Sequence, residues 1–368
     1  MRKVTLREIA ELAGVSLTSV HRVLNGKGGC SKAVEEKILR IAREQGYSTN
    51  ITASHLRRQP LHIALVFPLR ERGSWYFTER MLDGYLDFRS EVSDFNAIFQ
   101  EFYLKTAAEK GEIGPDTVYE ELETILRQIY REQPVHYDGL VIYGLTITRR
   151  AEALLNRIVG SGTKVVVLER SPQGLEDNCT VQVDDKIAGN MAGEMLIKGL
   201  SQSGTVVIIS QLLPEGDPSS QICMDCLAKE RPDLVTIDMP LLQNVDQSTV
   251  ILQRLGQIPD LVGIYATSAR HTHSMIGALR MLGRKPHSVI GSELFEDSYR
   301  ALWDKIVDVI IDKRPEQIGY MGLQLLFNAL VKNDPLPTVH RITPRVILRA
   351  NSDAYYVKRE DLYGDASY

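Results

Sequence analysis

Several acidic, basic and aromatic side chains follow short apolar runs in this chain, and together they could recognise a small polar molecule. Glu169 and Arg170 come directly after the run Lys164–Leu168, and Glu293 follows Val289–Ser292. An open α/β sheet binds its ligands beyond the carboxyl ends of its strands, so these positions are candidate contacts. The predicted ligand-binding residues are Ser74, Trp75, Tyr76, Glu169, Arg170, Thr267, Ser268, Arg270, Glu293 and Asp312.

The mixture of residue types suits a neutral polyhydroxylated ligand, because carboxylates and guanidinium groups pair with vicinal hydroxyls. An arginine-rich site would also accept a phosphorylated or acidic sugar. Structural interpretations stay open as well. Trp75 could be a packed surface aromatic, Glu169 and Arg170 a plain ion pair, and Asp312 a loop carboxylate.

Catalytic motifs do not accompany these residues. The sequence has no G-x-S-x-G elbow, no Walker A loop and no HExxH pair. His271 and His273 are two residues apart and do not share a helix face. Cys223 and Cys226 form a CxxC without a second pair, which favours reduced structural cysteines over a metal or redox site. We therefore expect no enzyme, no cofactor and no metal.

The first part of the chain predicts two short helices joined by a tight turn. Thr5 and Glu8 form a capping box, so a helix should begin at Leu6, with a buried stripe of Ile9, Ala10, Leu12 and Ala13. Gly14 can end this helix in a left-handed conformation, and Ser16 is a good N-cap for the next. The second helix should bury Val20, Val23 and Leu24. Its exposed face would carry small polar and basic residues, which is typical of a helix-turn-helix.

A third helix is expected from about Ser31 to Gln45, followed by a short segment that reaches Arg58. The whole region resembles the DNA-binding headpiece and hinge of LacI-type transcriptional regulators. The residues in register with that family are Val4–Leu6, Ile9–Ala10, Ala13–Ser16, Val20, Arg22–Asn25, Ser31, Gly46–Tyr47, Asn50, Ala53 and Leu56. Two residues depart from the family pattern. His21 stands where serine is common, and Thr49 where proline is common.

The resemblance implies binding to double-stranded DNA, as a homodimer on a near-palindromic operator. Residues of the second helix would approach base edges in the major groove. Leu56 would wedge into the minor groove from a hinge helix that is too short to form alone, although it could also be an ordinary linker leucine. The implied DNA-binding residues are Thr5, Ser16, Leu17, Thr18, Ser19, His21, Arg22, Asn25, Ser31, Tyr47, Asn50, Ala53 and Leu56.

Charge is unevenly distributed between this region and the rest of the chain. The whole chain has a net charge of −4, yet residues 1–58 contain eleven Lys and Arg against five Asp and Glu. A positive head suits the phosphate backbone, and a negative body discourages other contacts with DNA. No long apolar run and no signal-like segment is evident, so we expect a cytoplasmic bacterial protein with no membrane partner.

From Leu61 the pattern changes to alternating strands and helices, and it restarts after Arg170. This order predicts an α/β fold: the headpiece and hinge helix, then a bilobed body of two doubly wound parallel sheets. The body is similar to the type I, ribose-type periplasmic binding proteins that form the sensor of LacI-type regulators. The expected domains are 1–49 (headpiece), 50–60 (hinge), 61–170 with 309–335 (N-terminal lobe), 171–308 with 336–358 (C-terminal lobe) and 359–368 (tail).

In that family, an Asp-Arg pair comparable to Glu169 and Arg170 grips sugar hydroxyls, and an acid usually stands at the position of Glu293. The resemblance implies a ligand-responsive regulator, by default a repressor of carbohydrate-utilisation genes. Its effector would be a sugar, polyol or sugar phosphate bound between the lobes. An activator of the same architecture, a solute receptor and a sugar-processing enzyme are the alternatives.

Overall fold

The N-terminal region contains three helices around a small apolar core. A computed structural model describes residues 6–24, 31–44, 60–68, 76–104, 115–131, 136–144, 147–170, 172–213, 215–242 and 246–356. The three helices are α1 (Leu6–Ala13), α2 (Leu17–Leu24) and α3 (Lys32–Glu44). Their shared core is Ile9, Ala10, Ala13, Val20, Val23, Ile38 and Ala42.

The predicted signals between α1 and α2 are confirmed. Gly14 has a φ of 67°, which glycine adopts at low cost, and Val15 N donates to Ala10 O at 3.1 Å. Ser19 N donates to Ser16 Oγ at 3.1 Å, so Ser16 caps α2. The prediction for Leu12 was wrong, because this side chain is 55% exposed. Thr5 lies outside the described residues.

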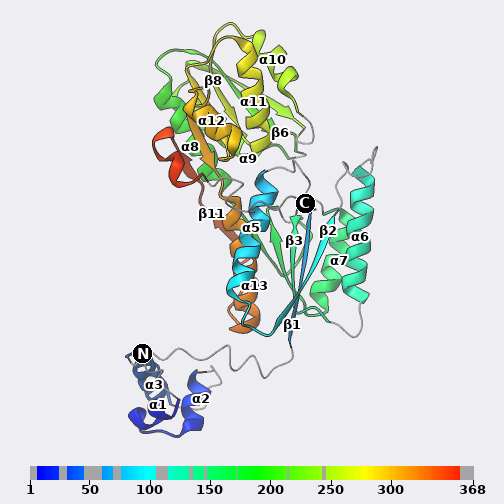
Figure 1. Cartoon of the computed structure of the whole chain (residues 1–368), viewed down its shortest axis with the longest axis vertical. Helices are drawn as coiled ribbons and strands as arrows, with labels where there is room; N and C mark the ends of the chain where they lie inside the picture. The colour runs from blue at the N-terminus through cyan, green and yellow to red at the C-terminus, as the bar shows by residue number, and fades with distance from the viewer. Residues whose placement is uncertain are drawn as a thin grey trace, which may run out of the picture. The chain divides into compact units, whose positions relative to one another are not determined.

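The body begins with a six-stranded sheet in the order β11-β5-β4-β3-β1-β2. Its strands are β1 (Leu61–Pro68), β2 (Ala97–Leu104), β3 (Gly139–Tyr143), β4 (Lys164–Leu168), β5 (Asn178–Val183) and β11 (Val339–Ile342). The pairs β1–β3, β3–β4, β4–β5 and β5–β11 are parallel. The helices packed on this sheet are α5 (Tyr76–Glu91), α6 (Pro115–Arg131), α7 (Arg149–Gly160) and α13 (Pro315–Val331). Helices α5 and α13 run side by side on one face, and α6 and α7 cover the other (Figure 1).

The second sheet has the strand order β12-β10-β9-β8-β6-β7. Its strands are β6 (Gly204–Gln211), β7 (Leu234–Leu241), β8 (Leu261–Ala266), β9 (Ser288–Ser292), β10 (Val309–Asp312) and β12 (Arg345–Ile347). All its pairs are parallel except β10–β12. The accompanying helices are α8 (Asp185–Gly199), α9 (Pro218–Glu230), α10 (Ser248–Gly256), α11 (Ala269–Leu282), α12 (Glu296–Trp303) and the short 3-10 helix η3 (Arg349–Ala354). Two separate apolar cores form on its faces, so the doubly wound arrangement is confirmed.

The chain passes between the two sheets three times: from β5 to α8, from β10 to α13, and from β11 to β12. Sheet membership differs from the expected lobe boundaries at three strands. β5 and β11 belong to the first sheet, and β10 belongs to the second. A strand's own hydrophobic period predicts that it is a strand, but not which distant strand it pairs with. That partner is set by long-range packing.

The helices α5 and α13 approach unusually closely. A Cβ atom on Gly84 would collide with the carbonyl oxygen of Glu316, and one on Gly319 would collide with the carbonyl oxygen of Met81. These two glycines therefore let the helix backbones touch. Within the described ranges, no helix combines the length and apolar character needed to cross a bilayer.

Candidate functional site

Two buried carboxylates lie side by side at the ends of neighbouring strands. In the parallel β9–β10 pair, Ser292 stands opposite Ile311, so the next residues, Glu293 and Asp312, are also neighbours. Glu293 N donates to Ile311 O at 3.2 Å, and both acidic residues are only 1% exposed. Burial raises the pKa of Glu293 well above its usual range, and the charge of Asp312 raises it further.

Lys313 is buried among carboxylates that come from several elements. Its backbone N donates to Glu293 Oε2 at 3.1 Å, and its Nζ donates to the carbonyl oxygen of Thr267 at 2.8 Å. Burial alone would lower the pKa of Lys313. The surrounding carboxylates outweigh burial and raise it; they are Asp185, Asp217, Glu293 and Glu169. Lys313 is therefore an internal cation that acidic groups of both sheets surround.

Glu169 approaches Lys313 from the first sheet. It follows β4 with a φ of 73°, a left-handed conformation that is uncommon for a non-glycine residue. Burial raises the pKa of Glu169 to about 7, with a further contribution from Asp185, and Lys313 and Arg170 oppose the shift. Glu293 shares the left-handed conformation, with a φ of 67°. Glu169 is partly buried and Glu293 is buried, and strained backbone of this kind is common at binding sites.

Asp217 accepts hydrogen bonds from residues at the ends of two strands of the second sheet, Gln211 at the end of β6 and Thr267 after β8. It caps α9 by accepting from Ser219 N at 3.0 Å, and its other oxygen accepts from Thr267 Oγ1 at 2.6 Å. Ser268 has a local role, because its Oγ caps α11 through His271 N. Arg270 acts on the pKa of the neighbouring His271, and burial lowers the pKa of Arg270 itself to about 10.

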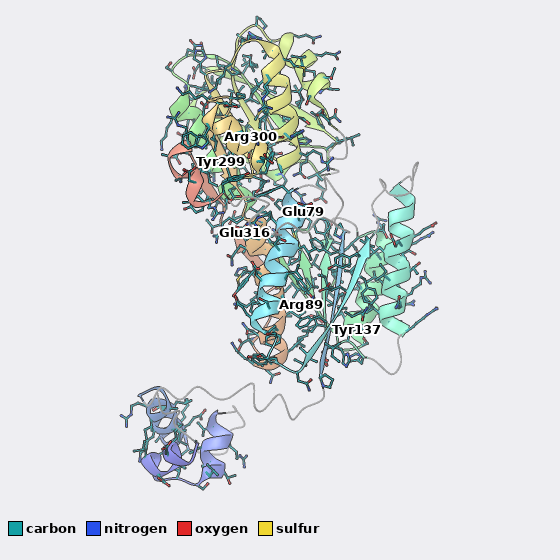
Figure 2. All side chains as sticks on the ribbon, in the orientation of Figure 1. Glu79, Arg89, Tyr137, Tyr299, Arg300 and Glu316 are labelled. Atoms are coloured by element: carbon teal, nitrogen blue, oxygen red, sulfur yellow. The ribbon has the colours of Figure 1, made fainter. Side chains whose placement is uncertain are left out.

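A second charged contact joins two of the connections between the sheets, the one from β10 to α13 and the one from β11 to β12. Arg345 Nε donates to Asp312 Oδ2 at 2.7 Å, and Arg345 Nη2 lies 3.3 Å from Glu316 Oε1. Glu316 lies in the first turn of α13, which neighbours α5 (Figure 2). Asp312 therefore accepts from Arg345 through Oδ2, and its charge also acts on Glu293.

Tyr76, the first residue of α5, contacts a residue that belongs to the part of the chain around the second sheet. Its ring centroid lies 5.8 Å from that of Phe295, which caps α12. Burial raises the pKa of Tyr76 well above its usual range, and the charge of Asp312 adds to this. Ser74 and Trp75 lie outside the described residues.

The structure thus brings four of the predicted residues around one centre: Glu169, Thr267, Glu293 and Asp312. Tyr76 and Arg170 border it. Four further residues at this centre were not predicted from the sequence: Lys313, Asp185, Asp217 and Arg345. Lys313 could have been noticed because it directly follows a strand, whereas Arg345 follows a strand-to-strand connection that carries no motif. Among the described residues, no cluster of His, Cys, Asp and Glu could hold a metal ion.

The predicted DNA-binding residues are only partly described. Leu17, Thr18 and Arg22 are exposed on α2, and Ser16 is exposed at its start. Ser31 precedes α3, and its carbonyl oxygen accepts from Val34 N and Glu35 N. His21 lies in α2, but its side chain is outside the described part. Thr5, Asn25, Tyr47, Asn50, Ala53 and Leu56 lie outside the described residues entirely.

Two family models match this chain. Residues 105–334 match the periplasmic binding protein domain, and residues 5–50 match the bacterial regulatory proteins of the lacI family. The class of protein that these observations define is a body of two α/β sheets joined by three connections, preceded by a helix-turn-helix. Because the first match spans more than half of the chain, the chain belongs to the periplasmic binding protein domain family, with a lacI-family domain at its N-terminus.

Similar proteins agree with this assignment. The ribitol operon repressor of Klebsiella aerogenes is 44% identical over 72 residues, which are 18% of this chain and 27% of that protein. The regulator TreR of Salmonella typhimurium is 25% identical over 178 residues, or 48% of this chain and 49% of that protein. The matches thus span about a quarter to a half of these relatives.

Solved structures share the fold of the body. AraP, an arabinose binding protein from Geobacillus stearothermophilus, has a TM-score of 0.64 at 18% identity and covers 82% of this chain and 100% of its own. A solute binding protein from Burkholderia graminis in complex with D-arabinose has a TM-score of 0.67 at 18% identity, covering 82% and 99%.

Proposed function

We propose that this protein is a sequence-specific transcriptional regulator, by default a repressor, whose affinity for its operator changes when a sugar-like effector binds in the body. One observation carries the proposal: a lacI-family helix-turn-helix and a periplasmic-binding-protein body occur in the same chain. The repressor names of the relatives support the same function.

The N-terminal part would bind DNA through α2. Its exposed residues Thr18 and Arg22 suit base edges, and Ser16 at the helix start suits a phosphate. A homodimer on a near-palindromic operator would double this small interface and would allow the hinge segments to pair. The unequal charge of head and body supports this role.

The body would bind the effector where the strand ends meet around Lys313. Glu169 belongs to the first sheet, and Thr267, Glu293 and Asp312 belong to the second. A ligand that contacts both sets would favour one angle between the sheets. Such a preference becomes a coupling free energy between effector and operator of about 1–3 kcal/mol, and it must be reciprocal.

The test is to select binding sites from random double-stranded DNA with the full chain, and then to measure operator affinity with and without sugars by fluorescence anisotropy. We expect a near-palindromic site and a change in affinity of at least fivefold with one sugar class. Failure to select any sequence would contradict regulation and favour a solute receptor. Turnover of a sugar on incubation would favour an enzyme.

A further inference from the structure

The rings of Tyr76 and Phe295 meet between the two lobes, which are the first and the second sheet, each with its own helices. Their centroids lie 5.8 Å apart at an interplanar angle of 43°. Aromatic pairs attract each other at separations of about 4.5–7 Å. Tyr76 begins α5 in the first lobe, and Phe295 directly precedes α12 in the second. This partly buried contact therefore belongs to both lobes.

The first lobe holds Tyr76 firmly. Helix α5 packs on α13 so closely that neither Gly84 nor Gly319 has room for a Cβ atom. The guanidinium of Arg80 lies over the Tyr76 ring, 5.9 Å from its centroid. Because α5 is fixed to its own sheet in this way, a rotation between the lobes must move Tyr76 relative to Phe295.

Ser298 holds the backbone of Phe295 in the second lobe. Ser298 is fully buried, and its Oγ accepts from Phe295 N at 2.9 Å and donates to Glu293 O at 2.8 Å. Leu294, which lies between these two residues, is only 2% exposed. Glu293 is one of the buried acids at the strand ends. The ring of Phe295 is thus joined through one hydroxyl to a residue of the buried centre.

A second, weaker contact also crosses between the lobes. Gln173 follows β4 of the first sheet, Glu215 follows β6 of the second, and Gln173 Nε2 donates to Glu215 Oε1 at 3.0 Å. Both residues are exposed. A hydrogen bond between two long exposed side chains contributes little, because ordering them costs entropy. Gln173 and Glu215 are therefore suitable reporters of how close the lobes are.

We propose that Tyr76 and Phe295 form a clamp that holds the two lobes together, and that Ser298 joins this clamp to Glu293. Opening the body must separate the two rings and expose apolar surface to water, which is unfavourable. The clamp sets the balance between a closed and an open body through contacts of the protein itself. This inference rests on the fold of the body and does not use the proposed function.

The experiment measures cross-linking between the lobes in the full chain, without DNA or any added small molecule. Gln173→Cys and Glu215→Cys place two thiols at the reporter positions. Cys30→Ser and Cys226→Ser remove competing thiols, and the other two cysteines are buried. A short bis-maleimide bridges the two thiols when the lobes are closed and modifies each thiol separately when they are open. Mass spectrometry gives the ratio of the bridged to the doubly modified product.

Leucine variants of the clamp are compared in this chain. Phe295→Leu and Tyr76→Leu keep apolar side chains but remove one ring each, so either should lower the ratio by about twofold or more. Since both act through one contact, the double variant should lower it no further than the stronger single variant. Phe99→Leu is the matched control, because Phe99 is a partly buried ring on β2 that lies under Arg89 of the same lobe. It should keep the parent ratio.

A serine pair tests the link to Glu293. Ser298→Ala leaves Phe295 N without its acceptor, so the ring is held less firmly and the ratio should fall. Ser352→Ala is the same change at another fully buried serine, which donates to Arg349 O within η3, and it should keep the parent ratio. A parent ratio in Ser298→Ala would overturn the link between the clamp and Glu293.

Two results would overturn the clamp itself. One is a parent ratio in both leucine variants, and the other is a double variant in which the two single effects simply add. Circular dichroism and urea midpoints check that each variant folds, and if one leucine variant does not fold, the other decides. None of these measurements involves operator or effector, so the proposed function stands or falls separately.

Discussion

Arg345 on β12 holds the buried carboxylate of Asp312 at the end of β10, with Nε donating to Oδ2 at 2.7 Å. The two residues are register partners in the β10–β12 pair, which is antiparallel. Each also stands at a different connection between the sheets, and Arg345 reaches Glu316 in α13 as well. The Arg345 guanidinium therefore contacts both the end of β10 and the start of α13, the helix that packs on the first sheet.

Arg345→Met should destabilise the body by about 3 kcal/mol, because Asp312 would stay buried beside Glu293 and Glu316 without its cation. Urea unfolding followed by tryptophan fluorescence measures the change. The double variant Arg345→Met with Asp312→Asn should recover most of the loss. If the double variant is as unstable as the single one, the loss comes from packing and not from charge.

Glu169 should make the stability of the body depend on pH. Its pKa is raised to about 7 in the folded chain, above its value of 4.5 when unfolded. The folded state therefore holds more protons between these values, so the free energy of unfolding falls as the pH rises through this window. The total loss attributable to Glu169 is about 3 kcal/mol by pH 8.

Glu169→Gln removes this titration, so the variant should gain stability over the parent at pH 8 and not at pH 4. Urea midpoints at both values of pH measure the difference. Since other groups also titrate, the comparison between parent and variant is the informative quantity. An equal difference at both values would contradict the assignment.

The close contact of α5 and α13 should be sensitive to a single methyl group. Gly84→Ala and Gly319→Ala each place a Cβ against a carbonyl oxygen of the opposite helix, and should cost about 1–3 kcal/mol. Gly160→Ala in α7 is the control, because nothing lies within 4 Å of its Cβ. Melting temperatures should fall for the first two variants and stay level or rise for the third.

Arg22→Ala should remove specific operator binding by the N-terminal helices. Arg22 is exposed on α2, and loss of one good base contact costs about 1–3 kcal/mol, or roughly tenfold to a hundredfold in affinity. Arg40→Ala on α3 is the matched control and should weaken operator and random DNA alike. Fluorescence anisotropy with both DNA sequences distinguishes these cases. Unchanged specificity in Arg22→Ala would refute the predicted contact.

Much of the fold follows from local signals in the sequence. Gly14 and Ser16 predicted the turn between α1 and α2, because each acts through its own backbone and its immediate neighbours. Leu12 was assigned wrongly to the core, since helical spacing alone does not say how wide the buried stripe is.

The site was predicted less completely than the fold, for a physical reason. Glu169 and Glu293 were recognised because each directly follows a strand, and Asp312 because it lies near the last crossing of the chain. Lys313 and Arg345 were missed because their roles depend on partners far away in the chain, at Asp185 and Asp312. Sheet assignment failed in the same way for β5, β10 and β11, whose pairing is non-local.

The left-handed backbone at Glu169 and Glu293 has a consequence for engineering the protein as a sensor. Each non-glycine residue at such a φ costs about 1–2 kcal/mol, which glycine would relieve. Glycine would also delete the carboxylates that face Lys313. Directed evolution for heat resistance alone should therefore enrich glycine at positions 169 and 293 and yield robust but unresponsive proteins, so ligand response must be screened in every round.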